Sequence, residues 1–156
     1  MLFKIILLIT ILSYSAIVAQ SFMYIIALKK VQYKMQAASY IELRKFLDAA
    51  FNATYKFAVY AALLSNIALL VVTGKNYFSI FFVTSCLAFG ALIMDVLLAL
   101  KGNMPINKQI NTWAVDSYPE DWADYRAEWL QIFQYRQVVT ITGFIILLAG
   151  VVFGLY

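Results

Sequence analysis

The sequence predicts an all-α membrane protein, in which four transmembrane helices form a four-helix bundle that is the single domain 1–156. Apolar residues make up 64% of the chain and charged residues 13%, against about 45–50% and about 25% in soluble domains. The apolar residues also gather into four runs, each long enough to cross a hydrocarbon layer of about 30 Å as a helix. The predicted spans are residues 5–28, 51–73, 77–100 and 137–156.

Two of these helices are expected to extend beyond the bilayer, both on the side of the loops 1–2 and 3–4. Ser39 and Ser117 are each followed three residues later by a glutamate, which is the pattern of a capping box at a helix start. No breaker separates either serine from the apolar run that follows it. The second and fourth helices are therefore predicted to begin near these serines and to run unbroken into the membrane.

The predicted extramembrane cap consists of residues 29–50 and 101–136. Residues 101–118 contain Gly102, Pro105 and several asparagines and aspartates, a composition that favours turns over a regular element.

The distribution of lysine and arginine predicts the orientation. Nine of these residues flank the first and third loops and only two lie on the opposite side. Because cytoplasmic loops are enriched in basic residues, the prediction is a multi-pass protein of the cell membrane with both termini outside. The nine are Lys29, Lys30, Lys34, Arg44, Lys45, Lys101, Lys108, Arg126 and Arg136, and the two are Lys4 and Lys75.

Several classes of function are disfavoured by composition. The chain has no histidine and one cysteine, Cys86, so the commonest metal ligand and general base is missing and no metal or cofactor is expected. The net charge of +4 comes from residues that flank apolar runs, where they meet lipid headgroups. The expected partner is thus the lipid bilayer rather than nucleic acid.

Asp95 is the first candidate for chemistry, because it is the only charged residue of the third predicted span. A carboxylate inside a membrane is costly unless it is paired or hydrated. Arg136 lies at the matching end of the fourth span. Two interpretations remain open: a structural ion pair between the two, or a catalytic site in which Asp95 takes a proton and Arg136 or Arg126 holds the resulting anion.

Polar and aromatic residues of the third loop and fourth helix form the second candidate set. Asn103 and Asn107 can bind a polar ligand group, or they can cap helix ends. Arg126 lies within helical reach of Trp122 and Trp129, so cation–π stacking is available. These residues, together with Trp113, either form an aromatic-lined pocket or anchor the helix at the membrane interface.

The pattern Asn103-x-Pro105-x-Asn107, followed by Trp113, Trp122, Arg126, Trp129 and Arg136 before a final span, resembles the anthrone-oxygenase-like membrane proteins. The resemblance covers most of the chain and includes the Leu47-Asp48 pair that ends the first loop. It implies the oxygenation of polycyclic phenols to quinones without a metal or flavin. The residues that match are Asn103, Asn107, Trp113, Arg126, Trp129 and Arg136. Members often have a histidine or asparagine before the final arginine; this chain has Gln134 nearby.

Two classes of function follow from these observations. The first is a cofactor-independent oxygenase-like enzyme, or a binder of a membrane-soluble aromatic small molecule or lipid. The alternative is a non-catalytic membrane module, such as a complex subunit, a lipid-binding protein or an assembly factor. A transporter ranks last, because one buried acid without an inverted repeat makes a poor pathway. A ligand-sized cavity that touches Asp95 and the segment 103–107 would favour binding or catalysis, and a filled interior would favour the module.

Overall fold

The computed structural model describes residues 1–154, and within that range it contains only helices and the segments that connect them. Four helical segments are long and apolar enough to cross a membrane: Leu2–Lys34, Ala37–Thr73, Ile80–Thr112 and Trp122–Gly154. The prediction of an all-helical protein with four candidate spans is confirmed. Residues 155 and 156, which end the predicted fourth span, lie outside the described part of the chain.

Each of the first three segments consists of two α-helices joined by a π-helical turn. The first comprises α1 (Leu2–Met23), η1 (Tyr24–Leu28) and α2 (Lys29–Lys34); the second α3 (Ala37–Ala50), η2 (Phe51–Tyr55) and α4 (Lys56–Thr73); the third α5 (Ile80–Leu98), η3 (Ala99–Asn103) and α6 (Met104–Thr112). The fourth is one α-helix of 33 residues, α7 (Trp122–Gly154). Because a π turn winds more slowly than an α turn, it shifts which side chains beyond it face the bundle interior.

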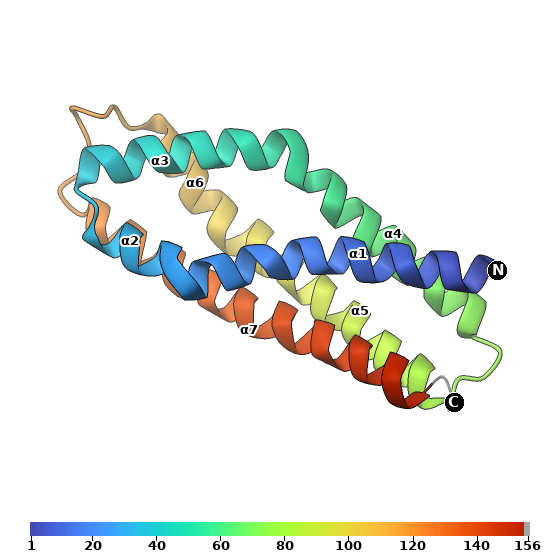
Figure 1. Ribbon diagram of the computed structural model, residues 1–156. Coiled ribbons are helices and arrows are strands. Elements are labelled where there is room, and N and C mark those ends of the chain that lie inside the picture. Colours follow the sequence, from blue (N-terminus) through green and yellow to red (C-terminus); the bar gives the residue numbers. More distant parts are fainter. Residues whose placement is uncertain (155–156) are drawn as a thin grey trace.

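The four segments close into an antiparallel bundle (Figure 1). α5 runs along α7, α1 packs on both α4 and α7, and α4 contacts α5. The N-terminus, the end of α7 and the turn between α4 and α5 lie together, and we call this the terminal end. The opposite end, which we call the cap end, is formed by α2, α3, α6 and the start of α7.

Each end has its own hydrophobic core. The core toward the terminal end consists of Leu7, Tyr14, Ile17, Val18, Ala62, Leu69, Phe81, Ala88, Leu92 and Leu147. The core of the cap end is richer in aromatic rings and consists of Tyr24, Tyr40, Ile41, Ile106, Ile110, Trp113, Trp129, Leu130 and Phe133.

Small residues allow α7 to approach its neighbours closely. A Cβ added to Gly143 would lie 2.5 Å from the Cβ of Ala91 and would also collide with the hydroxyl of Tyr14. At Gly150 an added Cβ would lie 2.9 Å from the Cβ of Thr84. Close contact through glycine is the usual way in which membrane helices pack, because lipid gives no hydrophobic drive for association.

The predicted starts of the second and fourth helices were wrong by a few residues. α3 begins at Ala37, with Gln36 rather than Ser39 as its N-cap. α7 begins at Trp122, because Ser117 exchanges both of its backbone hydrogen bonds with Ala114, at 3.0 and 3.3 Å, and so closes a turn instead of opening a helix. The predicted continuity of both helices into their apolar runs is confirmed.

The third segment also differs from the expectation. It begins at Ile80 rather than Tyr77, because the hydroxyl of Ser79 accepts a hydrogen bond of 3.2 Å from the backbone N–H of Phe82 and caps the helix there. The predicted irregular loop at 101–118 is wrong for its first part, since the helix continues to Thr112. Each of the four helical segments is therefore 33 or 37 residues long.

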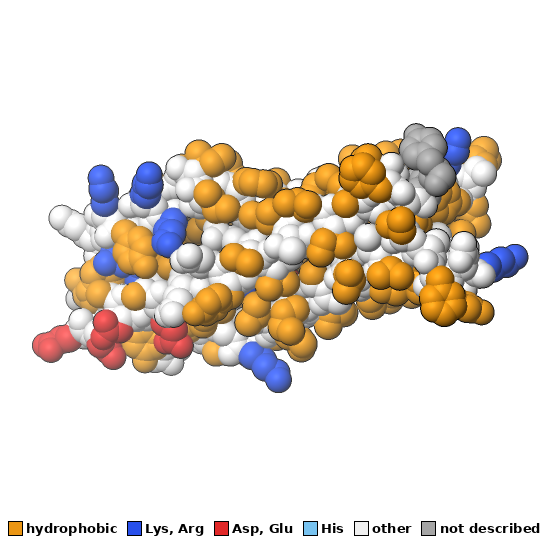
Figure 2. Space-filling model, turned by 90° about the horizontal axis from the view of Figure 1, so that it is seen from below, with side chains coloured by type: hydrophobic (Ala, Val, Ile, Leu, Met, Phe, Trp, Pro, Cys, Tyr) orange, Lys and Arg blue, Asp and Glu red, His pale blue; other side chains and the backbone are white. Residues whose placement is uncertain are grey.

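Charged side chains gather at the cap end. Figure 2 shows the acidic side chains and several basic ones there, while an apolar surface covers much of the remaining length. Large side chains such as Leu64, Val71 and Phe153 are 67%, 74% and 72% exposed. Surfaces of this size and composition need lipid as solvent, so the chain is a multi-pass membrane protein.

Candidate functional site

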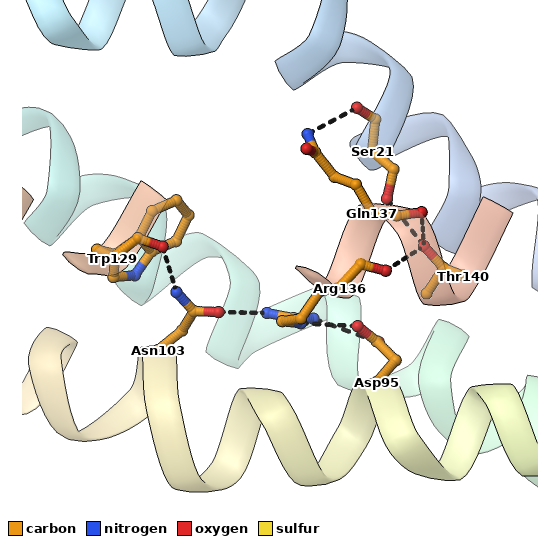
Figure 3. Close-up of polar contacts among 7 residues, drawn as sticks. All are labelled: Ser21, Asp95, Asn103, Trp129, Arg136, Gln137 and Thr140. Atoms are coloured by element: carbon orange, nitrogen blue, oxygen red, sulfur yellow. Dashed lines mark hydrogen bonds and ion pairs between the residues drawn. The ribbon is translucent and has the colours of Figure 1, made fainter. Parts of the chain in front are cut away.

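The centre of the site is an ion pair between α5 and α7. The Nε of Arg136 donates to one carboxylate oxygen of Asp95 at 2.7 Å, and the Nη2 donates to the other at 3.3 Å (Figure 3). Asp95 is 2% exposed. This two-point geometry matches the fork of a guanidinium to a carboxylate. The predicted contact between Asp95 and Arg136 is confirmed.

Asn103 extends the ion pair toward the cap end. Its side-chain oxygen accepts from Nη1 of Arg136 at 3.2 Å, and its Nδ2 donates to the backbone carbonyl of Trp129 at 2.9 Å (Figure 3). Asn103 is buried, and it is the last residue of η3. The amide of Asn103 therefore links the third segment to α7 at two points, Trp129 and Arg136.

Asn107 is the next junction of the network. Its oxygen accepts from the indole Nε1 of Trp129 and from Nη2 of Arg44, both at 2.8 Å. Its Nδ2 donates to Asp48 at 2.8 Å, and Asn111 donates to the other oxygen of Asp48 at 2.8 Å. Asparagine suits this position because one side chain offers an acceptor and two donors.

Arg44 enters the same network from α3. Its guanidinium stacks on the ring of Trp129, with Cζ 3.7 Å from the ring centroid. Its Nη1 donates to the hydroxyl of Tyr24 at 3.2 Å. The cation that stacks on Trp129 is therefore Arg44. Arg126 instead stacks on Trp122, with Cζ 4.5 Å from its centroid, and also lies over the rings of Tyr33 and Tyr40 at 5.8 Å.

A cavity of about 310 Å³ opens beside this network. It lies between the second and third helical segments, with α7 and one residue of α1 closing it. Its lining is Gln20, Arg44, Asp48, Phe51, Asn52, Tyr55, Lys56, Val59, Tyr60, Asp95, Val96, Ala99, Leu100, Asn103, Met104, Asn107, Trp129 and Arg136. Two of the π turns, η2 and η3, supply six of these residues. The volume falls at the lower end of the usual range for small-molecule sites, about 300–1,000 Å³.

Five of the eight residues that the sequence singled out line this cavity: Asp95, Arg136, Asn103, Asn107 and Trp129. The other three lie elsewhere. They are Trp113, Trp122 and Arg126, and they belong to the cap end.

Two of them, Arg126 and Trp113, take part in contacts at helix ends. Nη1 of Arg126 donates to the carbonyls of Gln32 and Met35 at 3.1 and 2.9 Å, at the point where α2 ends. A cation at that place satisfies carbonyls that have no partner within the helix and complements the helix dipole. In the same way, Lys45 donates to the carbonyl of Trp113, just beyond α6.

Burial also changes the acidity of a tyrosine at the cap end. Desolvation raises the pKa of Tyr40 to about 12, against an opposing effect of the Arg44 charge. Its hydroxyl is buried and has no hydrogen-bond partner. Tyr40 therefore remains a neutral hydroxyl throughout the physiological range of pH.

A second polar cluster ties α1 to α7 on the other side of Arg136. The hydroxyls of Ser21 and Thr140 lie 3.1 Å apart, and the Nε2 of Gln137 donates to the carbonyl of Ser21 at 3.2 Å (Figure 3). All three side chains are buried. They satisfy one another, so this cluster has a structural explanation that needs no ligand.

The residues that sequence reasoning missed come mainly from the second segment. Arg44, Asp48, Phe51, Tyr55 and Val59 line the cavity at steps of three and four residues. That spacing marks one face of a helix, and it was visible in the sequence. The sequence predicts an extramembrane cap at residues 29–50, and this prediction separates Arg44 and Asp48 from the residues that follow on the same face.

The comparisons with known proteins give no match: no family model, no curated protein and no solved structure corresponds to this chain. Among residues 1–154 there is also no cluster of three or more side chains of the kinds that hold a metal ion. The resemblance to the anthrone-oxygenase-like proteins therefore rests on the residues quoted above.

Removal of one member of the central ion pair should strongly destabilise the protein. Asp95→Asn leaves the guanidinium of Arg136 without its counter-ion, and Arg136→Met leaves a buried carboxylate; each should cost about 3–5 kcal/mol of unfolding free energy. Replacing both residues by leucine should cost less than either single change. The measurement is reversible denaturation in mixed micelles.

The control is Lys29→Met, which breaks an exposed contact to Gln134 of 2.9 Å and should cost less than about 1 kcal/mol. Wild-type stability in Asp95→Asn would contradict the prediction.

Proposed function

We propose that this membrane protein binds a membrane-soluble aromatic molecule that carries a phenolic or keto oxygen, and that the cavity beside Asp95 and Arg136 is its site. One observation carries the proposal. Tyr55 lines the cavity, and its buried hydroxyl has no hydrogen-bond partner among residues 1–154. Buried polar groups nearly always have partners, so a ligand oxygen that pairs with Tyr55 would complete the site.

The rest of the lining supports a ligand of this kind. Phe51, Val59, Val96 and Leu100 supply apolar walls, and Trp129 supplies an aromatic face. The few polar groups converge from different helices, as they do in sites that orient a largely apolar ligand. A planar phenol fits both requirements, and it can reach the cavity from the lipid.

Catalysis is the second candidate function, and the acid and cation side by side at the cavity favour it. Both oxygens of Asp95 accept from Arg136. A phenolic proton that moves to Asp95 would break one of these contacts and free the guanidinium to hold the phenolate, so charge is conserved within the site. The anion would then react with O2 that is dissolved in the lipid. In that reaction a ring methylene becomes a carbonyl, one oxygen atom enters the product and the other leaves as water.

The non-catalytic membrane module remains the alternative. It accounts for the ion pair and for the asparagine network, because those side chains satisfy one another. It gives no role to the cavity or to the Tyr55 hydroxyl, and for this reason we favour a ligand.

Binding should be detectable with 2-naphthol and with anthrone added to the protein in lipid nanodiscs. We expect saturable heat release in a calorimetric titration, after subtraction of the signal from protein-free nanodiscs. Tyr55→Phe removes one hydrogen bond and should weaken binding about 2- to 10-fold. The matched control is Tyr135→Phe, which alters an exposed tyrosine of α7 outside the cavity and should bind as the wild type does. If neither compound binds saturably, the proposal is wrong.

An oxygen electrode tests the catalytic candidate. Purified protein with anthrone should consume O2 faster than buffer does and should form one anthraquinone per O2 consumed. Asp95→Asn should stop the reaction, whereas Asp124→Asn, which alters an acid in the first turn of α7, should leave it unchanged. Saturable binding without oxygen uptake would exclude the catalytic candidate and keep the proposal that the protein binds an aromatic ligand.

We also propose the placement of the chain in the membrane. The bilayer would surround the core toward the terminal end, the cap end would project into the cytoplasm, and both termini would lie outside. The excess of basic residues at the cap end supports this orientation. Single cysteines can test it in a Cys86→Ser background. A cysteine at position 75 should react with an impermeant maleimide from outside, and one at position 34 should not. The reverse pattern would overturn the orientation.

A further inference from the structure

Arg44 is a buried cation without a carboxylate partner. Its side chain lines the cavity, and the residue is 2% exposed. Within residues 1–154, the ion pair of Asp95 with Arg136 is the only one that joins a cation and a carboxylate within 4.0 Å. A buried charge is normally paired, because leaving water costs several kcal/mol.

The groups that contact Arg44 are all neutral. They are the hydroxyl of Tyr24, the side-chain oxygen of Asn107 and the ring of Trp129. The remaining nitrogen, Nε, is buried and has no partner. One N–H of a buried guanidinium that borders the cavity thus has no partner among residues 1–154.

The obvious counter-ion is nearby but engaged elsewhere. Asp48 follows Arg44 by four residues on α3, a spacing at which opposite charges usually meet. Instead, Asn107 lies between them: it accepts from Arg44 and donates to Asp48, at 2.8 Å in each case. The second oxygen of Asp48 accepts from Asn111. Amides therefore occupy both oxygens of this carboxylate.

Arg136 shows how an arginine of this bundle holds a carboxylate. It holds the carboxylate of Asp95 through Nε at 2.7 Å and through Nη2 at 3.3 Å. Arg44 lines the same cavity, its Nε has no partner, and within residues 1–154 no carboxylate forms an ion pair with it. We propose that the ligand of this cavity is an anion, and that its carboxylate binds Arg44. This inference rests on the proposed function, because it describes the same ligand.

The position of the second free donor indicates the shape of the anion. Tyr55 follows Arg44 by eleven residues on one helical face, roughly 16 Å along the axis at 1.5 Å per residue. The carboxylate and the phenolic or keto oxygen would therefore sit at opposite ends of the molecule, with the apolar walls between them. A hydroxyaryl carboxylate has this arrangement.

Three related compounds test the inference: 6-hydroxy-2-naphthoate, its methyl ester and 2-naphthol. Each is titrated calorimetrically into the full chain in nanodiscs of zwitterionic lipid, and protein-free nanodiscs provide the blank. A charge-assisted hydrogen bond to Arg44 should make the acid bind roughly 10- to 100-fold more tightly than the ester. In Arg44→Met this preference should disappear, while affinity for the ester should change little. Arg126→Met is the matched control: it removes an arginine that also stacks on a tryptophan but lies outside the cavity, and the preference should remain.

The outcomes separate the two proposals. If 2-naphthol and the ester bind but the acid binds no more tightly than the ester, the anion is excluded and the aromatic ligand stands. A preference for the acid that survives in Arg44→Met also overturns the role of Arg44. If none of the three compounds binds, the proposed function itself fails. The comparison of acid with ester needs only the wild-type protein, so it decides the matter even where Arg44→Met does not fold.

Discussion

A charge inside an apolar bundle must find a partner, and the interior of this protein is arranged around that requirement. Asp95 and Arg136 form two hydrogen bonds between α5 and α7. These two helices make the most extensive contact in the bundle. The remaining donor of Arg136 then needs an acceptor, which Asn103 supplies. Each further polar group follows from the one before it, because an unsatisfied group in low dielectric costs more than the hydrogen bond that satisfies it.

The three π turns explain how so many polar groups reach one place. They interrupt the first three segments where the aromatic core of the cap end meets the core toward the terminal end. Beyond each turn the helix continues with a different face inward. Polar residues such as Tyr55 and Asn103 thereby line the cavity beside apolar walls. π turns are frequent at functional sites for this reason.

The spans and the central ion pair could be predicted because each depends on a single strong effect. Apolar runs of about twenty residues have few alternatives to a membrane helix, and the only charge of the third span needed a partner at the same depth. The cavity could not be predicted, because it depends on π turns that the sequence does not signal and on a helix at 101–112. Pro105 misled the reading there: it is the second residue of α6 and comes directly after the π turn η3, and the helical segment continues past it. The stacking partner of Trp129 was misjudged for a different reason. Arg126 is near in sequence, but Arg44 reaches the ring from another helix.

Asn107 has one consequence that concerns the alignment of the second and third segments. The two ends of its amide are not interchangeable: the oxygen faces two donors, Arg44 and Trp129, and the nitrogen faces an acceptor, Asp48. If either helix slid along the other by a single residue, donors would face donors and the carboxylate would face nothing. Apolar contacts between helices tolerate sliding, because one methyl group resembles the next. The amide of Asn107, with its distinct donor and acceptor ends, instead allows only one register between the two segments.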